Sequence, residues 1–261
     1  MPFPFELGVD LSTLTILALV AFMAGFIDAI AGGGGLLTIP ALLTAGLPPH
    51  LALGTNKLCA TFGSATASYT FYRRKLFAPR QWRNALIGTA VGAVLGAALA
   101  QWVPSAWLNQ MLPVVVFACG LYLLFGKTPA APLLADAPIA QGRQWPQGLS
   151  LGFYDGVAGP GTGAFWTVSS LLLYPLDLVR ASGVARSMNF VSNACALSVF
   201  IFSGQVAWLL GISMGLALMV GAFLGARTAI KGGSKFIRPV FILVVLGLTL
   251  RLAWQHWFGL A

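Results

Sequence analysis

Two apolar stretches of the sequence are interrupted in the same way, by an acid and then a cluster of glycines. The first interruption, Gly25 to Thr38, reads G-F-I-D-A-I-A-G-G-G-G-L-L-T, and the second, Gly152 to Thr167, reads G-F-Y-D-G-V-A-G-P-G-T-G-A-F-W-T. Each glycine weakens a helix by about 1 kcal/mol relative to alanine, so a cluster of them breaks the helix. The chain is therefore predicted to contain two copies of one unit, each built around a broken helix. The matching positions are Gly25 and Gly152, Phe26 and Phe153, Asp28 and Asp155, Ala31 and Ala158, Gly32 and Gly159, Gly34 and Gly161, and, after a one-residue insertion, Gly35 and Gly163.

The apolar stretches are long and charges are rare, which places the chain in a membrane. Of the 261 residues, 58% are hydrophobic and 8% are charged, whereas a soluble domain carries about 25% charged residues. Helices of about 20 apolar residues cross the hydrocarbon layer of a bilayer. An all-α integral membrane protein is therefore predicted. Its apolar segments run over about 11–31, 36–46, 49–72, 84–103, 107–125, 147–158, 162–175, 179–203, 205–226 and 239–257.

The basic residues, which give a net charge of +9, gather mostly in short loops between these segments. Membrane proteins concentrate Lys and Arg in cytoplasmic loops, so nucleic-acid binding is not expected. In the first half, loop 73–83 is basic and loop 103–107 is not. In the second half, the equivalent loop 203–205 has no charge and loop 227–238 is basic. The basic loops swap places, which predicts two repeats of opposite orientation in the membrane.

The predicted organisation is a first repeat over 1–126, a cytoplasmic linker over 127–146, and an inverted second repeat over 147–261. Each repeat would hold a glycine-broken pair of short helices and three long transmembrane helices. The inversion requires an odd number of crossings per repeat, which is five if the short segments cross and three if they are re-entrant. Both counts place the N-terminus and the C-terminus outside the cell.

The sequence lacks the motifs of an enzyme, a metal site or an ATP-driven pump. It has two histidines, His50 and His256, without an H-E-x-x-H pattern, and three cysteines, Cys59, Cys119 and Cys195, without a C-x-x-C pattern. It also has no G-x-x-x-x-G-K-[ST] loop for ATP. No enzymatic activity, cofactor or metal is therefore expected.

Asp28 and Asp155 are the acids that lie within the apolar cores of the two repeats. A carboxylate at the middle of a bilayer costs at least about 2.5 kcal/mol, so an acid placed there usually has a function. Three roles stay open. The aspartates could carry protons or bind a coupling cation, they could cap the helices that restart after the glycines, or they could pair with Lys57 or Arg186.

Lys57 and Arg186 also occupy matching positions, about eight residues into an apolar segment of each half. In a dry site both cations suit a small anion, Arg as a planar two-pronged donor and Lys as a point charge. The alternative is that the long side chains extend to the nearer membrane surface. Their common repeat position favours contact with a substrate.

The glycine breaks themselves predict an anion site. A helix that restarts after a break directs free N–H groups and the positive end of its dipole into the gap. Close helix packing is the alternative role of small residues in membranes, and it better suits the spaced Gly88, Gly92, Gly96, Gly221 and Gly225. For the polar residues near the cations, hydrogen bonding between helices is the alternative to substrate contact. The predicted substrate site comprises Lys57, Arg186, Gly33, Gly34, Gly35, Gly161, Gly163, Thr55, Asn56, Asn189 and Asn193, with Asp28 and Asp155 as coupling or proton-carrying residues.

The G-F-I-D-A-I-A-G-G-G-G stretch and the G-T-N-K stretch that ends at Lys57 resemble the sulfite exporter TauE/SafE family of bacterial membrane transporters. The resemblance extends over about residues 10–260. It implies a transporter in the bacterial inner membrane that moves sulfite, thiosulfate or organosulfonates, mostly outward. The second half departs from the pattern, with A-R-S-M-N over 185–189 where T-K-x-x-N is expected, so the threonine is lost and the cation is kept as Arg186.

These features together predict a secondary transporter that exports a small sulfur-containing oxoanion by alternating access around a site at the membrane midplane. An ion gradient, of protons or another coupling cation, or the gradient of the anion itself would supply the energy. The alternative function is a membrane receptor or subunit that binds a small anion without transporting it.

Overall fold

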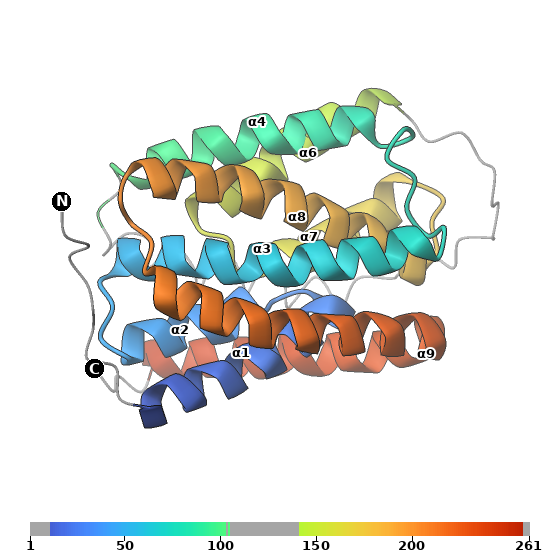
Figure 1. Cartoon of the computed structure of the whole chain (residues 1–261). Coiled ribbons are helices and arrows are strands. Elements are labelled where there is room, and N and C mark those ends of the chain that lie inside the picture. The colour runs from blue at the N-terminus through green and yellow to red at the C-terminus, as the bar shows by residue number, and fades with distance from the viewer. Residues whose placement is uncertain (1–10, 103, 105–140, 258–261) are drawn as a thin grey trace.

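The computed structural model describes residues 11–102, 104 and 141–257. Within these residues every regular element is a helix, and there are no strands (Figure 1). The helices are α1 (Leu11–Ala31), α2 (Gly35–Thr44), α3 (Pro49–Arg73), α4 (Arg83–Ala100), α6 (Gln141–Val157), α7 (Thr162–Leu173), α8 (Leu178–Phe202) and α9 (Trp208–Trp257).

Four of the described helices are long and apolar enough to cross a membrane, namely α1, α4, α8 and the Trp208–Ile237 part of α9. The helices α2 and α7 are apolar but shorter, at 10 and 12 residues. Large apolar side chains point outward from the bundle, and Leu19, Phe202 and Leu209 are 62%, 91% and 68% exposed. Such a surface suits a lipid environment. The fold is therefore all-α with the features of a multi-pass membrane protein, as predicted.

Both predicted helix breaks are present. The chain leaves the helical conformation at Gly32 and Gly33, with φ of 77° and 134°, and again at Gly159 and Gly161, with φ of 91° and 81°. Glycine adopts these positive φ values without the steric cost that other residues meet. A short helix, α2 or α7, follows each break.

Helices from the two halves of the chain pack closely against each other. Helix α4 lies along α6, and α1 lies along the first arm of α9, which is the part before Gly233 (Figure 1). A Cβ atom added at Gly92 would lie 2.3 Å from the carbonyl oxygen of Leu149, and one added at Gly221 would lie 2.0 Å from that of Phe22. These contacts confirm the packing role of the spaced glycines. Helices α3 and α8, which carry the two predicted buried cations, contact each other between these two layers.

The basic segment 227–238 is helical rather than a loop. Its backbone departs from helical geometry at Gly233, with φ of 62° and ψ of −164°, and there α9 folds back into a second arm (Figure 1). The prediction of a loop was wrong because Arg, Lys and Ala favour helices, so a cluster of charges does not by itself end one. The single glycine supplies the corner.

Helix α6 runs over Gln141–Val157 within the described residues, so it already includes residues before the predicted apolar segment starts at 147, and the end of the predicted linker is helical. Hydrogen bonds from Gln144 hold this first turn in place. Its Nε2 donates to the carbonyl oxygen of Gln81 at 2.7 Å, and its Oε1 accepts from the N–H of Ala85 at 3.3 Å. The described part of α6 thus includes polar residues, and a search for apolar segments could not have identified them as helical.

The predicted segment 107–125, the linker before 141 and residues 1–10 lie outside the described residues. The repeat boundaries and the opposite orientation of the two halves stay predictions.

Candidate functional site

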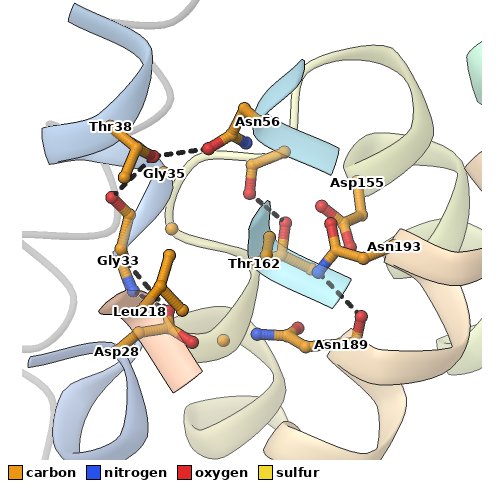
Figure 2. Close-up of a pocket in the computed structure, with 15 residues that line it drawn as sticks. Asp28, Gly33, Gly35, Thr38, Asn56, Asp155, Thr162, Asn189, Asn193 and Leu218 are labelled. Carbon is orange, nitrogen blue, oxygen red and sulfur yellow. Dashed lines mark hydrogen bonds between the residues drawn. The ribbon is translucent and has the colours of Figure 1, made fainter. Parts of the chain in front are cut away.

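A small cavity lies where the two helix breaks meet (Figure 2). Its volume is about 30 Å³, which is room for about two water molecules. Figure 2 shows Asp28 and Asp155 on opposite sides of it. The cavity is lined by Asp28, Gly33, Gly34, Gly35, Thr38, Asn56, Ala60, Asp155, Gly159, Gly161, Thr162, Gly163, Asn189, Asn193 and Leu218.

Asp28 caps the first break and also forms an ion pair. Its Oδ1 accepts hydrogen bonds from the N–H groups of Gly33 and Gly34, each at 2.9 Å. Its Oδ2 lies 3.5 Å from Nη1 of Arg186, and the same Nη1 donates to the main-chain carbonyl oxygen of Asp28. Asp28 therefore has two of the three roles left open for it at once: it caps the helix and it forms an ion pair.

Asp155 is more enclosed. Lys57 Nζ lies 2.8 Å from Oδ1 of Asp155, 2.5 Å from its carbonyl oxygen and 3.2 Å from Oδ1 of Asn193. The hydroxyl of Ser192 donates to the other carboxylate oxygen, Oδ2. An ammonium group has three protons, so every proton of Lys57 has an acceptor here.

The two ion pairs cross between the halves of the chain. Lys57 on α3 of the first half binds Asp155 on α6 of the second, and Arg186 on α8 of the second half binds Asp28 on α1 of the first. Lys57 and Arg186 are 1% and 0% exposed, so neither extends to the membrane surface. Each pair joins a broken helix of one half to a long helix of the other.

The structure does not bring all the predicted residues to the cavity lining. Lys57 and Arg186 lie behind it, in the ion pairs with the two aspartates that line it. Thr55 is turned away, and its Oγ1 accepts a hydrogen bond from the N–H of Ala207 at 2.9 Å.

The guanidinium of Arg186 keeps unused hydrogen-bonding capacity. Its Nε and Nη2 are buried and have no hydrogen-bond partner among the described residues. A Cβ atom added at Gly163 would lie 2.5 Å from Nη2, and one added at Gly32 would lie 2.8 Å from it. Nη2 therefore lies against the start of α7, next to the lining residue Gly163.

The first turn of each short helix contains a backbone N–H that forms no hydrogen bond among the described residues, and it lies beside an asparagine amide. Within the described part of the chain, neither the N–H of Gly35 nor that of Gly163 forms a hydrogen bond. Nδ2 of Asn56 lies 3.6 Å from a Cβ atom built on Gly35, and Nδ2 of Asn189 lies 2.8 Å from one built on Gly163. These donors border one cavity from the matching positions predicted for an anion site.

Hydrogen bonds fix the direction of the Asn56 amide. The hydroxyl of Thr38 donates to Oδ1 of Asn56, which turns Nδ2 away from Thr38 (Figure 2). Nδ2 of Asn193 donates to the carbonyl oxygen of Asn189 at 2.8 Å, so its Oδ1 is left to accept from Lys57. The amides therefore present donors near the helix starts and an acceptor near the lysine.

Sequence reasoning missed several residues around the cavity. Ser192, the hydroxyl partner of Asp155, lies three positions after Asn189 on the same helical face, and that spacing was an available signal. Thr162 marks the one-residue insertion at the second break, and its hydroxyl donates to the carbonyl oxygen of Gly159 at 2.6 Å. Ala60 and Leu218 also line the cavity, and no motif indicated them. Among the described residues, no group of three or more His, Cys, Asp or Glu side chains could hold a metal ion.

Comparison with known proteins identifies relatives that are described as membrane transporters. The chain is 40% identical over 259 residues to a Haemophilus influenzae protein described as "Probable membrane transporter protein", covering 97% of this chain and 99% of that one. It is 42% identical to "Probable membrane transporter protein ORF9" of a Sinorhizobium species, covering 92% of each chain. It is 38% identical to "Probable membrane transporter protein YfcA" of Escherichia coli, covering 95% of this chain and 94% of that one.

No solved structure matches the chain. Residues 17–252 match the sequence profile described as "Sulfite exporter TauE/SafE". The match spans most of the chain, including both glycine breaks and both ion pairs. The protein therefore belongs to the sulfite exporter TauE/SafE family of membrane transporters.

Proposed function

We propose that this protein is a secondary transporter that exports a small sulfur-containing oxoanion such as sulfite, thiosulfate or an organosulfonate. The two halves, in inverted orientation, would alternate access to the cavity between the helix breaks. The observation that carries the proposal is the pair of free N–H groups, at Gly35 and Gly163, each beside an asparagine amide at the same cavity. Uncharged donors at two helix starts bind an oxoanion without requiring its full neutralisation.

The charges around the cavity supply a reason for coupling. Two cations and two carboxylates balance each other, so an entering anion brings uncompensated negative charge into a buried site. Protonation of one aspartate restores the balance, and this is the coupling role we assign to Asp28 or Asp155.

The closed size of the cavity indicates how transport would proceed. A volume of about 30 Å³ holds water-sized groups only, so the breaks must separate for an anion to enter. Because glycines with positive φ lie in both breaks, small rotations of the flanking helices open the cavity on one side or the other. The basic segments 73–83 and 227–238 would face the cytoplasm.

The experiment is efflux and counterflow of ³⁵S-labelled sulfite or thiosulfate in liposomes that contain the purified protein. Wild type is expected to exchange label, and Lys57→Ala and Arg186→Ala are each expected to abolish exchange. Arg80→Ala, an exposed arginine in the 74–82 connection, serves as the control and should transport normally. Unchanged transport in both the Lys57 and the Arg186 variant would contradict the proposed site. Binding without flux would identify a receptor or subunit instead.

A further inference from the structure

A second recess lies at the end of the bundle, between the last turns of α3 and the end of the first arm of α9. Its volume is about 490 Å³, within the range of ligand-binding pockets. In Figure 1 both helix ends lie at the same end of the bundle, where the chain turns after α3 and within α9. The recess is lined by Tyr69, Thr70, Arg73, Arg74, Phe223 and Arg227. It shares no lining residue with the cavity between the helix breaks.

The recess gathers positive charge that no acid of the described chain neutralises. Arg73, Arg74 and Arg227 all line it and are exposed. Among the described residues, the acids are Asp28, Asp155 and Asp177, and each forms its ion pair elsewhere. Arg73 and Arg74 at the end of α3 and Arg227 on α9 therefore line one hollow without an ion-pair partner among the described residues.

Aromatic rings orient two of these arginines. The Arg227 guanidinium carbon lies over the ring of Phe223, 4.0 Å from its centroid, and that of Arg73 lies 5.9 Å from the centroid of Tyr69. Nη1 of Arg73 also donates to the hydroxyl of Tyr69 at 3.4 Å. The guanidinium of Arg227, stacked on its ring, presents N–H groups at its edge, and that edge matches the two oxygens of a phosphate. The ordering cost of binding is reduced because the group is already held in place.

The recess lies where apolar surface gives way to charge. On the first arm of α9, Leu216, Val220 and Leu224 are 49%, 50% and 43% exposed, and Arg227 and Lys231 follow in the next turns. On α3, the half-exposed Tyr72 precedes Arg73 and Arg74. Aromatic and basic residues in this order mark the headgroup level of a bilayer, with hydrocarbon beside the apolar turns.

We propose that this recess binds the phosphate of an anionic phospholipid, with the arginines on the headgroup and the acyl chains along the apolar face of α9. The site bridges α3 and α9, so a bound lipid stabilises the contact between them. This inference stands independently of the transported substrate.

The test is the thermal unfolding midpoint of the purified full-length protein in detergent, titrated with phosphatidylglycerol or with phosphatidylcholine. The double variant Arg73→Gln/Arg227→Gln removes the two oriented guanidinium groups, and Arg80→Gln removes one exposed charge in the connection after α3, outside the recess. Phosphatidylglycerol is expected to raise the midpoint of wild type and of Arg80→Gln, while phosphatidylcholine leaves it unchanged. The double variant should bind phosphatidylglycerol about 25-fold more weakly, at about fivefold for each arginine, with its lipid-free midpoint retained.

Three outcomes would overturn the proposal. Equal loss of the lipid effect in Arg80→Gln and in the double variant would indicate general charge attraction rather than a site. Phosphatidylcholine carries a phosphate but no net charge, so a shift of the same size with this lipid would show that the site does not require an anionic headgroup. Protection by inorganic phosphate alone, at the concentration of the lipid, would identify a free anion as the ligand instead of a lipid.

Discussion

The two crossed ion pairs occupy matching positions but differ in how completely they are closed. Lys57 and Asp155 lie 2.8 Å apart, with side chains 2% and 3% exposed, and all three ammonium protons are bound. Arg186 and Asp28 lie 3.5 Å apart, Asp28 is 19% exposed, and two nitrogens of Arg186 lack partners. One pair is complete without a ligand, and the other keeps donors in reserve beside the cavity.

This difference assigns distinct roles to the two pairs. A buried ion pair with all its hydrogen bonds made mainly holds the structure in one arrangement. A pair with a longer contact and spare donors can exchange one partner for another at lower cost. The comparison predicts that the Lys57–Asp155 pair fixes the halves together and that an entering anion competes with Asp28 for Arg186.

The largest expected effect follows loss of the closed pair. Lys57→Met leaves the Asp155 carboxylate buried with the Ser192 hydroxyl but without a cation, and breaking such a pair costs about 3–5 kcal/mol. We expect a marked fall in the thermal unfolding midpoint together with loss of transport. The double variant Lys57→Met/Asp155→Asn removes both charges and should recover most of the stability. A single variant as stable as wild type would show that this pair is not structural.

Arg186→Lys tests the open pair. The substitution keeps the positive charge but removes the spare donors at Nε and Nη2. A hydrogen bond to a charged group contributes about 1.5–3 kcal/mol, so labelled-anion exchange should fall by about 10- to 100-fold. The unfolding midpoint should change little, because Asp28 keeps its two backbone donors at Gly33 and Gly34. Full transport by this variant would show that charge alone suffices.

Substitutions at the two aspartates are expected to affect different properties, proton coupling at Asp28 and stability at Asp155. Asp28→Asn retains a side chain that can accept from the Gly33 N–H but cannot gain or lose a proton. It should still exchange labelled anion across the membrane, while a pH-sensitive dye inside the liposomes no longer reports proton movement with the anion. Asp155→Asn should instead lower the unfolding midpoint. Intact proton movement in Asp28→Asn would show that Asp28 is not the coupling residue and would transfer that role to Asp155.

A matched pair of glycines at the two helix starts includes the substitution with the smallest expected effect on transport, Gly35→Ala. In Gly163→Ala the new methyl group would lie 2.5 Å from Nη2 of Arg186, so transport should fall by at least tenfold. In Gly35→Ala the nearest atom would be 3.6 Å away, an ordinary contact, and transport should change by less than about threefold. Equal effects in exchange assays would show that the two starts are equivalent and that the spare arginine donors are unimportant.

Much of the fold could be predicted from the sequence because membrane helices follow from composition and glycine clusters follow from backbone freedom. The breaks at 32–33 and 159–161 and the packing glycines of α4 and α9 all lie where local chemistry requires them. Boundaries set by tertiary contacts could not be predicted this way, as the start of α6 at Gln141 shows, since its hydrogen bonds reach across to α4 and the preceding turn.

The sequence predicted which residues belong to the site better than it predicted which of them pair with each other. Repetition indicated both aspartates, both cations and both glycine breaks, because a sequence repeat places equivalent residues in equivalent positions. The pairing partners span 98 residues for Lys57 and Asp155 and 158 for Arg186 and Asp28, and only the packing of the two halves decides them. The inequality of the two pairs depends on neighbours such as Ser192, which no repeat position indicated.

A structure of the protein with bound thiosulfate, located by the anomalous scattering of its sulfur atoms, tests the central claim most directly. The account predicts sulfur density between the two helix starts, with anion oxygens within hydrogen-bonding distance of the N–H groups of Gly35 and Gly163 and with Arg186 turned toward the anion. An anion bound away from both helix starts, with Arg186 still held by Asp28, would contradict it.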